Sequence, residues 1–370
     1  MEIQYTKRLE KIEAQIRSWL PENPDSEWVK KVFGISDEIK AALVKNLTLP
    51  GWDLVNRGGK RWRPLLMLLS AEAVGGERGA EAALPLTPLV EFPHNASLIH
   101  DDIEDNSDER RGKPAVHLIY GTDTAINGGA FMYFLPLACL SGCGNAALKE
   151  RVFTAWAGHM RALHLGQAMD IAWHRDFHSL PGLDEYDRMC RLKTGCLARL
   201  AAILGVYAGS SSGGAGFSGE ADFSSGADLL NGASVNALAG IFAGAAEELG
   251  VGFQILDDVK NLDSGVPGKK RGDDIVEGKK SLPVLLFLHR YPEKTDFAAR
   301  CFTAARSGGA QAPEVEEFIL CLKNTGVLEE ARAKGQEYIQ NSVRAFSAPA
   351  GILLHEEGRK LLAGFINLLV

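Results

Sequence analysis

Three aspartates in the stretch LIHDDIEDNSDERRGKP, residues 98–114, have a spacing that suits a metal ion. Asp101, Asp102 and Asp105 stand at i, i+1 and i+4, so a helix would put the first and third on one face with Asp102 beside them. Like charges at this spacing repel, and a bound cation would relieve the repulsion. Mg²⁺ fits, because it takes one or two carboxylates together with waters and substrate phosphates. A solvated acidic helix end is the alternative, whereas an EF-hand loop from Asp105 would need glycine where Arg110 stands.

The same spacing recurs about 155 residues later, in FQILDDVKNLD. Asp257, Asp258 and Asn261 again stand at i, i+1 and i+4 after an apolar run, while Asp263 points to another face of the helix. Two such clusters favour a pair of helices that present carboxylates to one cavity.

Basic residues gather in four other short stretches. Two glycines, Gly58 and Gly59, precede the first of them, and glycine lets the backbone approach a ligand closely. Any one of these cations alone is more often a solvated surface charge. Together they would surround phosphate groups, with guanidinium forks for paired contacts and ammonium groups as point charges. The members are Lys60, Arg61, Arg63, Arg110, Arg111, Lys193, Lys270 and Lys279.

The bulk composition narrows the class of protein. The 370 residues carry a formal net charge of −7, with a pI of about 5.8, which argues against a nucleic-acid partner. The first 15 residues are polar and charged, so we expect no secretory signal, and no uninterrupted apolar run is long enough to span a membrane. Six cysteines without a CxxC pair are too sparse for a disulfide framework. We therefore expect a cytoplasmic protein.

Helix-period and buried-helix patterns cover most of the chain, and strand and hairpin signals are weak, so we predict an all-α fold. Two Gly-rich breaks, 209–234 and 305–314, are expected to be loops, and we favour a single domain across residues 1–370 over a boundary at the first. The predicted helical segments are 10–20, 63–74, 91–105, 150–174, 197–209 and 243–262.

The motifs GGKRWRP, LIHDDIEDNSDERRGKP, GQAMD, KTG and FQILDD…GDDIVEGKKSLP occur in this order between about residue 50 and residue 290. In this set the chain resembles the trans-isoprenyl diphosphate synthases, closest to the geranylgeranyl diphosphate synthase branch. The resemblance implies an all-α isoprenoid synthase fold around a large central cavity, and a homodimer. It implies head-to-tail (1′-4) condensation of isopentenyl diphosphate with an allylic diphosphate.

The resemblance also implies roles for residues at matching positions. Three Mg²⁺ ions are expected with substrate bound: two on Asp101, Asp102 and Asp105, and a third held or oriented by Asp257, Asp258 and Asn261. The residues taken as catalytic are Asp101, Asp102, Asp105, Lys193 and Asp257. Arg110, Lys193, Thr194 and Lys270 would hold the allylic diphosphate, with Gln254 beside it and Lys279 closing over it. Gly59, Lys60, Arg63, His94 and Arg111 would hold isopentenyl diphosphate, and Gln167 and Asp170 of GQxxD would support the basic side chains.

Product length depends on the residues just before the first aspartates. In the family, a large aromatic at the position of Ala96 or Ser97 floors the cavity and stops growth at fifteen carbons. Both residues are small here, so we expect a twenty-carbon product, with a longer polyprenyl diphosphate as the alternative. Further candidates for the floor, each of which is more often an ordinary core residue, are Phe131, Tyr133, Phe134 and His164.

Two more remote functions share part of these motifs. A class I terpene cyclase also uses DDxxD, but Asn261 and Gly265 stand where its second motif needs Ser or Thr and then Glu. An inactive partner subunit of a heteromeric synthase would have lost acids from one motif, whereas both are substantially present here.

Overall fold

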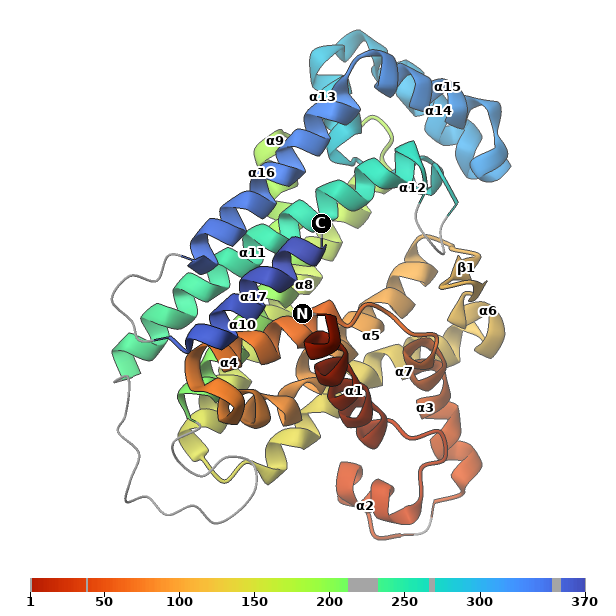
Figure 1. Cartoon of the computed structure of the whole chain (residues 1–370). Helices are drawn as coiled ribbons and strands as arrows, with labels where there is room; N and C mark the ends of the chain where they lie inside the picture. Colours follow the sequence, from red (N-terminus) through yellow and green to blue (C-terminus); the bar gives the residue numbers. More distant parts are fainter. Residues whose placement is uncertain (1, 38, 212–231, 266–269, 348–353, 370) are drawn as a thin grey trace. The chain divides into compact units, whose positions relative to one another are not determined.

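The structure, a computed structural model, describes residues 2–37, 39–211, 232–265, 270–347 and 354–369, and helices make up most of them (Figure 1). The predicted all-α class is confirmed. The chain divides into two compact units. Unit 1 comprises Met1–Met160, Leu197–Gly244 and Ala345–Leu369, and unit 2 comprises Arg161–Cys196 and Ala245–Arg344.

Unit 1 holds the first acidic motif. Its α5 lies against α7, and α7 also contacts α3. Helix α10 packs tightly on α4, because a Cβ on Gly209 would come within 2.6 Å of the Ala71 carbonyl oxygen. The elements of this unit are α1 (Glu2–Trp19), α2 (Ser26–Phe33), α3 (Ala41–Asn56), α4 (Trp62–Ala83), η1 (Leu84–Leu86), α5 (Pro88–Glu104), β1 (Glu109–Arg110), β2 (Lys113–Pro114), α6 (Val116–Tyr120), α7 (Thr122–Phe134), η2 (Leu135–Gly142), α10 (Cys196–Ser210, from Leu197) and α17 (Glu356–Leu369).

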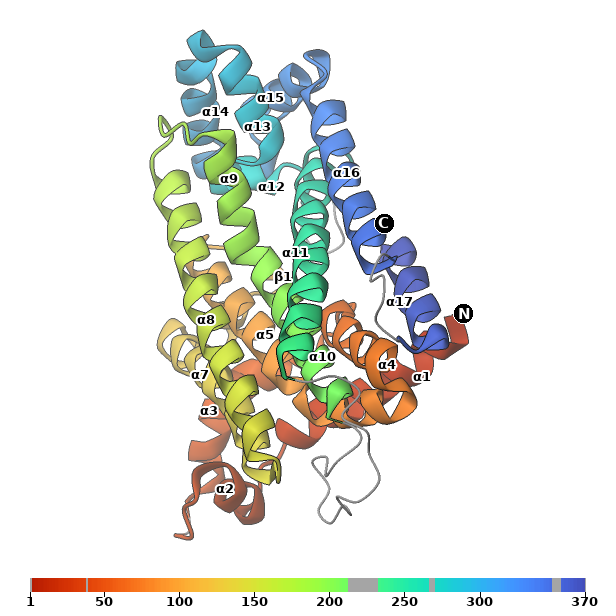
Figure 2. The ribbon, with the colours of Figure 1, turned by 90° about the vertical axis from the view of Figure 1, so that its left-hand side faces the viewer.

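Unit 2 holds the second acidic motif. In both views α13, α14 and α15 gather at one end of this unit, around buried Phe302 and Phe318 (Figures 1 and 2). Its elements are α9 (Leu183–Cys190), η3 (Arg191–Gly195), α12 (Asp273–Glu277), α13 (Leu282–Arg290), η4 (Pro292–Lys294), α14 (Thr295–Gly308), η5 (Gly309–Gln311), α15 (Pro313–Asn324) and α16 (Val327–Ser347). Helices α8 (Ala146–Arg175) and α11 (Gly232–Asp263) contribute residues to both units, and the last three residues of α16 belong to unit 1.

The predicted helices are all present, and most are longer than expected. The predicted loop at 305–314 is wrong for most of its length, because α14 continues to Gly308 and a 3₁₀ turn leads almost directly into α15 at Pro313. The other predicted loop, 209–234, is helical at its described ends, where α10 reaches Ser210 and α11 begins at Gly232; residues 212–231 lie outside the described residues.

A two-residue hairpin, β1–β2, was not expected. Its strands pair antiparallel, with Glu109 opposite Pro114 and Arg110 opposite Lys113. Arg111 and Gly112 between them have φ values of 54° and 74°, and positive φ at both central residues is what a type I′ turn requires. This hairpin was hard to predict, because arginine rarely adopts a positive φ.

Two helical stretches of the described residues, Thr122–Gly142 and Leu183–Ser210, are long and apolar enough to cross a membrane. Half of the apolar window in the first and 78% of that in the second are buried inside the protein. The same composition is found in core helices, so this is weak evidence for a span.

Candidate active site

The first acidic motif lies at the carboxyl end of α5. Asp101 and Asp102 belong to its last turn, and Asp105 is its C-cap, whose backbone N–H donates to the Asp101 carbonyl oxygen at 2.8 Å. Asp102 is fully buried, whereas the Asp101 side chain is 14% exposed. The helical spacing expected from the sequence therefore holds, with Asp105 one residue beyond the helix.

Arg110, on the hairpin, binds this acid cluster. Its Nε donates to Asp102 Oδ1 at 2.8 Å, a second guanidinium N–H donates to the same oxygen, and Asp101 Oδ2 lies 3.9 Å away. A buried carboxylate needs such a partner. The sequence placed Arg110 among the phosphate-binding cations but gave no sign of this pairing.

Arg111, the next residue, points to another set of partners. One of its guanidinium nitrogens donates to the Leu54 carbonyl oxygen at 2.9 Å and to Asn95 Oδ1 at 3.2 Å. Burial lowers the pKa of Arg111 to about 10, and Arg61 and Arg110 add to the effect while Glu91 opposes it. Gly59 lies against this side chain: its φ is 150°, and a Cβ there would come within 3.2 Å of the guanidinium. The motif glycine is thus explained by close approach.

His94 and Arg63 complete the cationic group in unit 1. An Arg63 guanidinium nitrogen lies 3.4 Å from His94 Nε2, and the Arg63 guanidinium lies 4.4 Å from the centre of the Trp62 ring. Burial holds the pKa of His94 well below its usual value, and Arg63, Arg111, Arg61 and Arg110 lower it further. So much positive charge in one place favours a polyanion.

Two predicted cations of the GGKR stretch differ in their surroundings. Arg61 is buried and binds Glu13 at 2.7 Å, Glu91 at 2.9 Å and the Val55 carbonyl oxygen at 2.6 Å. These contacts occupy the side chain, so Arg61 stabilises the unit. Lys60 is exposed.

In unit 2, Lys193 and Thr194 reach two different helices. Lys193 Nζ donates to Asp170 Oδ2 of α8 at 2.5 Å, and Thr194 Oγ1 donates to Gln254 Oε1 of α11 at 2.7 Å. Gln254 Nε2 in turn donates to Asp258 Oδ1 at 2.7 Å. The Asp170 contact is of the supporting kind that the GQxxD element was expected to make. Gln167 of the same element is half-buried.

The second acidic motif is divided by burial. Asp257 is exposed. Asp258 is buried, accepts from the Tyr186 hydroxyl at 3.1 Å, and has its pKa raised well above the usual value by burial and by Asp274. Asn261 is also buried; its Oδ1 accepts from the Asp274 backbone N–H at 3.2 Å. The three residues expected to act together on a metal therefore differ: one faces solvent and two are bonded to neighbouring protein groups.

Asn261 also organises the segment that carries the remaining predicted cations. Its Nδ2 donates to the Lys270 carbonyl oxygen at 3.5 Å, while the Lys270 side chain is exposed. Lys279 is half-buried; its ammonium pairs with Glu277 and lies 3.8 Å from Asp274 Oδ1.

The candidates for product length are not all buried. Ala96 is fully buried, and the Ser97 hydroxyl donates to the His94 carbonyl oxygen at 2.8 Å, so its polarity is satisfied within α5. Phe131 stacks on Phe33 of α2 with ring centres 5.6 Å apart. Tyr133 is buried, with its ring centre 5.8 Å from that of His100. Phe134 is 66% exposed, and His164 is exposed on α8.

Several residues with close contacts to the predicted site were not predicted. Asn95 binds Arg111 and also donates to Glu91 Oε1 at 2.9 Å. Asp274 raises the pKa of Asp258, and the Tyr186 hydroxyl donates a hydrogen bond to it. Only Asp274 had a signal in the sequence, since it stands in the quoted GDDIVEGKK stretch.

No cluster of three His, Cys, Asp or Glu side chains within the described part of the chain is arranged to hold a metal by itself. The aspartates nevertheless offer hard oxygen donors, which fit a cation that completes its shell with waters and phosphate oxygens. The donor set therefore suits Mg²⁺ bound together with a diphosphate.

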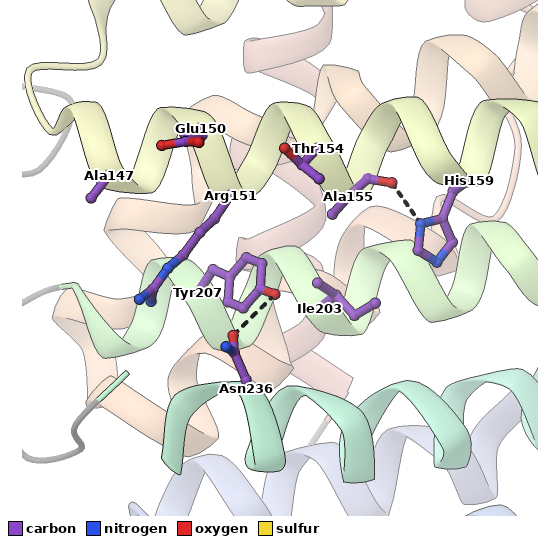
Figure 3. A pocket seen from close by; sticks show the side chains of 9 residues that line it. All are labelled: Ala147, Glu150, Arg151, Thr154, Ala155, His159, Ile203, Tyr207 and Asn236. Carbon is purple, nitrogen blue, oxygen red and sulfur yellow. Dashed lines mark hydrogen bonds between the residues drawn. The ribbon is translucent and has the colours of Figure 1, made fainter. Parts of the chain in front are cut away.

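Unit 1 also contains a surface cavity of about 640 Å³ between α8, α10 and the start of α11 (Figure 3). Arg151, Tyr207 and Asn236 line it, and the Tyr207 hydroxyl lies 3.5 Å from Asn236 Oδ1. None of the predicted site residues does, so it is separate from the motif chemistry.

The chain belongs to the polyprenyl synthetase family, a family of prenyltransferases that use divalent metal and act on isoprenoid diphosphates; the family model matches residues 44–218 and 220–318. The predicted family and the enzyme class are confirmed.

Relatives within the family are similar over different shares of their length. A geranylgeranyl pyrophosphate synthase, janG of Penicillium janthinellum, is 31% identical over 72% of this chain, which spans only 62% of that relative. The geranylfarnesyl diphosphate synthase of Aeropyrum pernix is 32% identical over 78% of this chain and 83% of its own. The solved geranylgeranyl pyrophosphate synthetase of Pyrococcus horikoshii is 26% identical, with a TM-score of 0.77 over 100% of this chain and 97% of that one. The isoprenoid synthase fold is thereby confirmed.

Proposed function

We propose that the chain catalyses Mg²⁺-dependent head-to-tail (1′-4) condensation of isopentenyl diphosphate with an allylic diphosphate to give a trans-prenyl diphosphate. One observation carries this proposal: in unit 1 the aspartates at the end of α5 lie beside a group of arginines, with Arg110 bonded to Asp102. Metal ligands and cations side by side suit a metal–diphosphate complex, because the carboxylates bind the metal ions and the arginines bind the phosphate oxygens.

Isopentenyl diphosphate is assigned to the cationic group of unit 1. The Arg63 N–H donates to His94 Nε2, so Nε2 is the acceptor and the ring proton sits on Nδ1. A neutral His94 then offers one N–H to a diphosphate oxygen while the guanidinium groups supply the charge. The residues of this site are Gly59, Lys60, Arg63, His94 and Arg111.

The allylic diphosphate is assigned to Lys193, Thr194, Lys270 and Arg110, with Gln254 beside it and Lys279 closing over it. The contact of Lys193 with Asp170 fixes the direction of the ammonium group before substrate binds. Preorganised cations stabilise the negative charge that grows on a departing diphosphate. We assign the proton lost after the carbon–carbon bond forms to that diphosphate.

Mg²⁺ is assigned to Asp101, Asp102 and Asp105, and a third ion to exposed Asp257. When bound, these ions neutralise the charge of the leaving group. Asp258 and Asn261 are bonded to Gln254, Tyr186 and the Asp274 backbone, which favours an orienting role for both rather than direct ligation.

We assign a twenty-carbon product as the first candidate, which the 31% identity to a geranylgeranyl pyrophosphate synthase favours. Ala96 and Ser97 are small, and the Ser97 hydroxyl is satisfied inside its own helix, so this face of α5 can border an apolar prenyl chain. A twenty-five-carbon or longer product is the second candidate, favoured by the 32% identity to a geranylfarnesyl diphosphate synthase.

The chain is further proposed to be a single cytoplasmic catalytic domain that acts as a homodimer. Ile126 and Phe134 stand eight residues apart on α7 and are 49% and 66% exposed, an apolar pair that a second copy would cover. Light scattering of the purified protein measures this directly, and a monomer would contradict it.

Product analysis tests the proposed reaction. The enzyme is incubated with isopentenyl diphosphate, farnesyl diphosphate and Mg²⁺, and the dephosphorylated products are separated by chromatography. A linear twenty-carbon alcohol supports the first candidate and longer linear alcohols the second. A cyclic hydrocarbon, or no product under conditions that bind both substrates, would contradict the condensation. Activity should vanish with EDTA and return with Mg²⁺.

A further inference from the structure

The turn that carries Lys193 and Thr194 is not an α-helix. Residues Arg191–Gly195, η3, form a π turn inside the helical stretch Leu183–Ser210. A π turn contains one residue more than an α-helical turn and frequently occurs at functional sites. Within this turn, two consecutive side chains bond to different helices, Lys193 to Asp170 and Thr194 to Gln254.

Glycines let the neighbouring helices come very close to this turn. A Cβ on Gly166 of α8 would collide with the Lys193 backbone nitrogen, and one on Gly250 of α11 would lie 2.7 Å from Gly195 Cα. The glycines of the GQxxD and KTG motifs are therefore packing residues. The turn has no room to shift toward either helix.

Arg191, the first residue of the turn, binds three carboxylates in unit 2. Its guanidinium donates to Asp187 Oδ2 at 2.7 Å, to Glu247 Oε2 at 3.0 Å and to Glu248 Oε1 at 2.8 Å. The hydroxyl of Tyr338, on α16, donates to Asp187 as well. A single side chain thus ties η3 to the end of α9 and to α11, at the level of the turn itself.

We infer that Arg191 is a positioning residue for the diphosphate-binding pair Lys193 and Thr194, which it holds by clamping the π turn to α9 and α11. The inference rests on the proposed function for the identity of the bound diphosphate. The Arg191 guanidinium is already paired with three carboxylates, so Arg191 acts by holding the turn and does not contact the substrate.

Replacing Arg191 tests the clamp. R191M should raise the KM for the allylic diphosphate and the dissociation constant of inorganic pyrophosphate by roughly ten- to a hundred-fold, since small misplacement of binding groups has effects of that size. The KM for isopentenyl diphosphate should change less than about threefold. R191K keeps the charge but loses the forked guanidinium, so its constants should lie between those of the wild type and those of R191M. Calorimetric titration with pyrophosphate and initial rates measure these quantities.

Two further variants separate positioning from folding and from net charge. R188M removes an exposed arginine from α9, one turn before Arg191, and should leave the KM for the allylic diphosphate and the dissociation constant of pyrophosphate unchanged. R191M/E247Q/E248Q also removes the negative charge of two of the carboxylates that Arg191 binds, so its melting temperature should recover while pyrophosphate binding stays weak. Equal constants in R191M and R188M, or full recovery of binding in the triple variant, would overturn the inference. A wild type that binds pyrophosphate but turns nothing over would count against the proposed function alone.

Discussion

Asp102 and Arg110 form the best-defined contact among the predicted site residues. Asp102 is fully buried and Arg110 is 13% exposed, so the pair is largely removed from water. Asp101 lies 3.9 Å from the same guanidinium and closer to solvent. The two neighbouring aspartates therefore have different surroundings: Asp102 fixes the hairpin to α5, and Asp101 is the more accessible of the proposed metal ligands.

Replacing each aspartate by asparagine should separate these two roles. We expect both D101N and D102N to lower turnover by about 100-fold or more, because each removes charge from the proposed metal site. D102N should also lower the free energy of unfolding by about 2 kcal/mol, since it weakens a buried ion pair, whereas D101N should change it by less than about 0.5 kcal/mol. Steady-state kinetics and denaturant titration measure both effects. Equal stability of the two variants would contradict the assigned role of Asp102.

The motifs themselves were predictable at the residue scale, because a helical spacing such as that of Asp101, Asp102 and Asp105 is local information. Burial was not. Nothing in FQILDDVKN distinguishes exposed Asp257 from buried Asp258, since the difference arises from Tyr186, 72 residues away in the chain. The pairing of Arg110 with Asp102 likewise depends on a turn in which an arginine adopts a left-handed conformation.

At the scale of elements, α5 carries most of the proposed chemistry of unit 1. His94, Ser97 and Asp101 follow one another at three- and four-residue steps, so they share one face of the helix. In the proposed site, the same face would meet isopentenyl diphosphate, the growing prenyl chain and the metal ions in turn. That these three residues share a face was predictable from periodicity, whereas their roles come from the resemblance to the family. The position of α7 beside α5 was not predictable, because it depends on glycines such as Gly129, whose added Cβ would lie 2.7 Å from His100 Nε2.

Product length should respond to α5 and not to the far side of α7. S97F places a ring one turn before Asp101 and should shorten the main product by one isoprene unit or more. S97A should leave it unchanged, and so should F134A, because Phe134 is 66% exposed. Chromatography of the dephosphorylated products gives the lengths. An unaltered product from S97F, or a longer one from F134A, would contradict this geometry.

For the whole molecule, one buried cation should make stability depend on pH. Lys280 is 2% exposed, and its ammonium lies 4.5 Å from the centre of the Phe302 ring. Burial lowers its pKa to about 8, with Arg306 adding to the effect and Asp176 opposing it. The folded chain therefore binds this proton less tightly than the unfolded chain does.

The sign of the effect follows from that difference. Below about pH 8 Lys280 is charged in both the folded and the unfolded state, and burying this charge lowers the free energy of unfolding by about 3 kcal/mol. This destabilisation decreases as the pH rises toward about 10, where the unfolded chain also loses the proton. K280M should raise the free energy of unfolding at pH 7 by up to that amount and remove this part of the rise above pH 8. K334M, which removes an exposed lysine of α16, serves as the control. Identical pH profiles for the two variants would contradict the prediction.

The π turn also bears on how the protein tolerates insertions and deletions. The turn holds one residue more than an α-helical turn, so losing the codon for Leu192 would leave a continuous α-helix whose parts on either side keep their directions, while the side chains within the turn would change theirs. Lys193 and Thr194 could then no longer face Asp170 and Gln254. A gene shortened by three nucleotides at this point would encode a chain that folds but binds the diphosphate weakly. The same deletion in an exposed loop would leave binding unchanged.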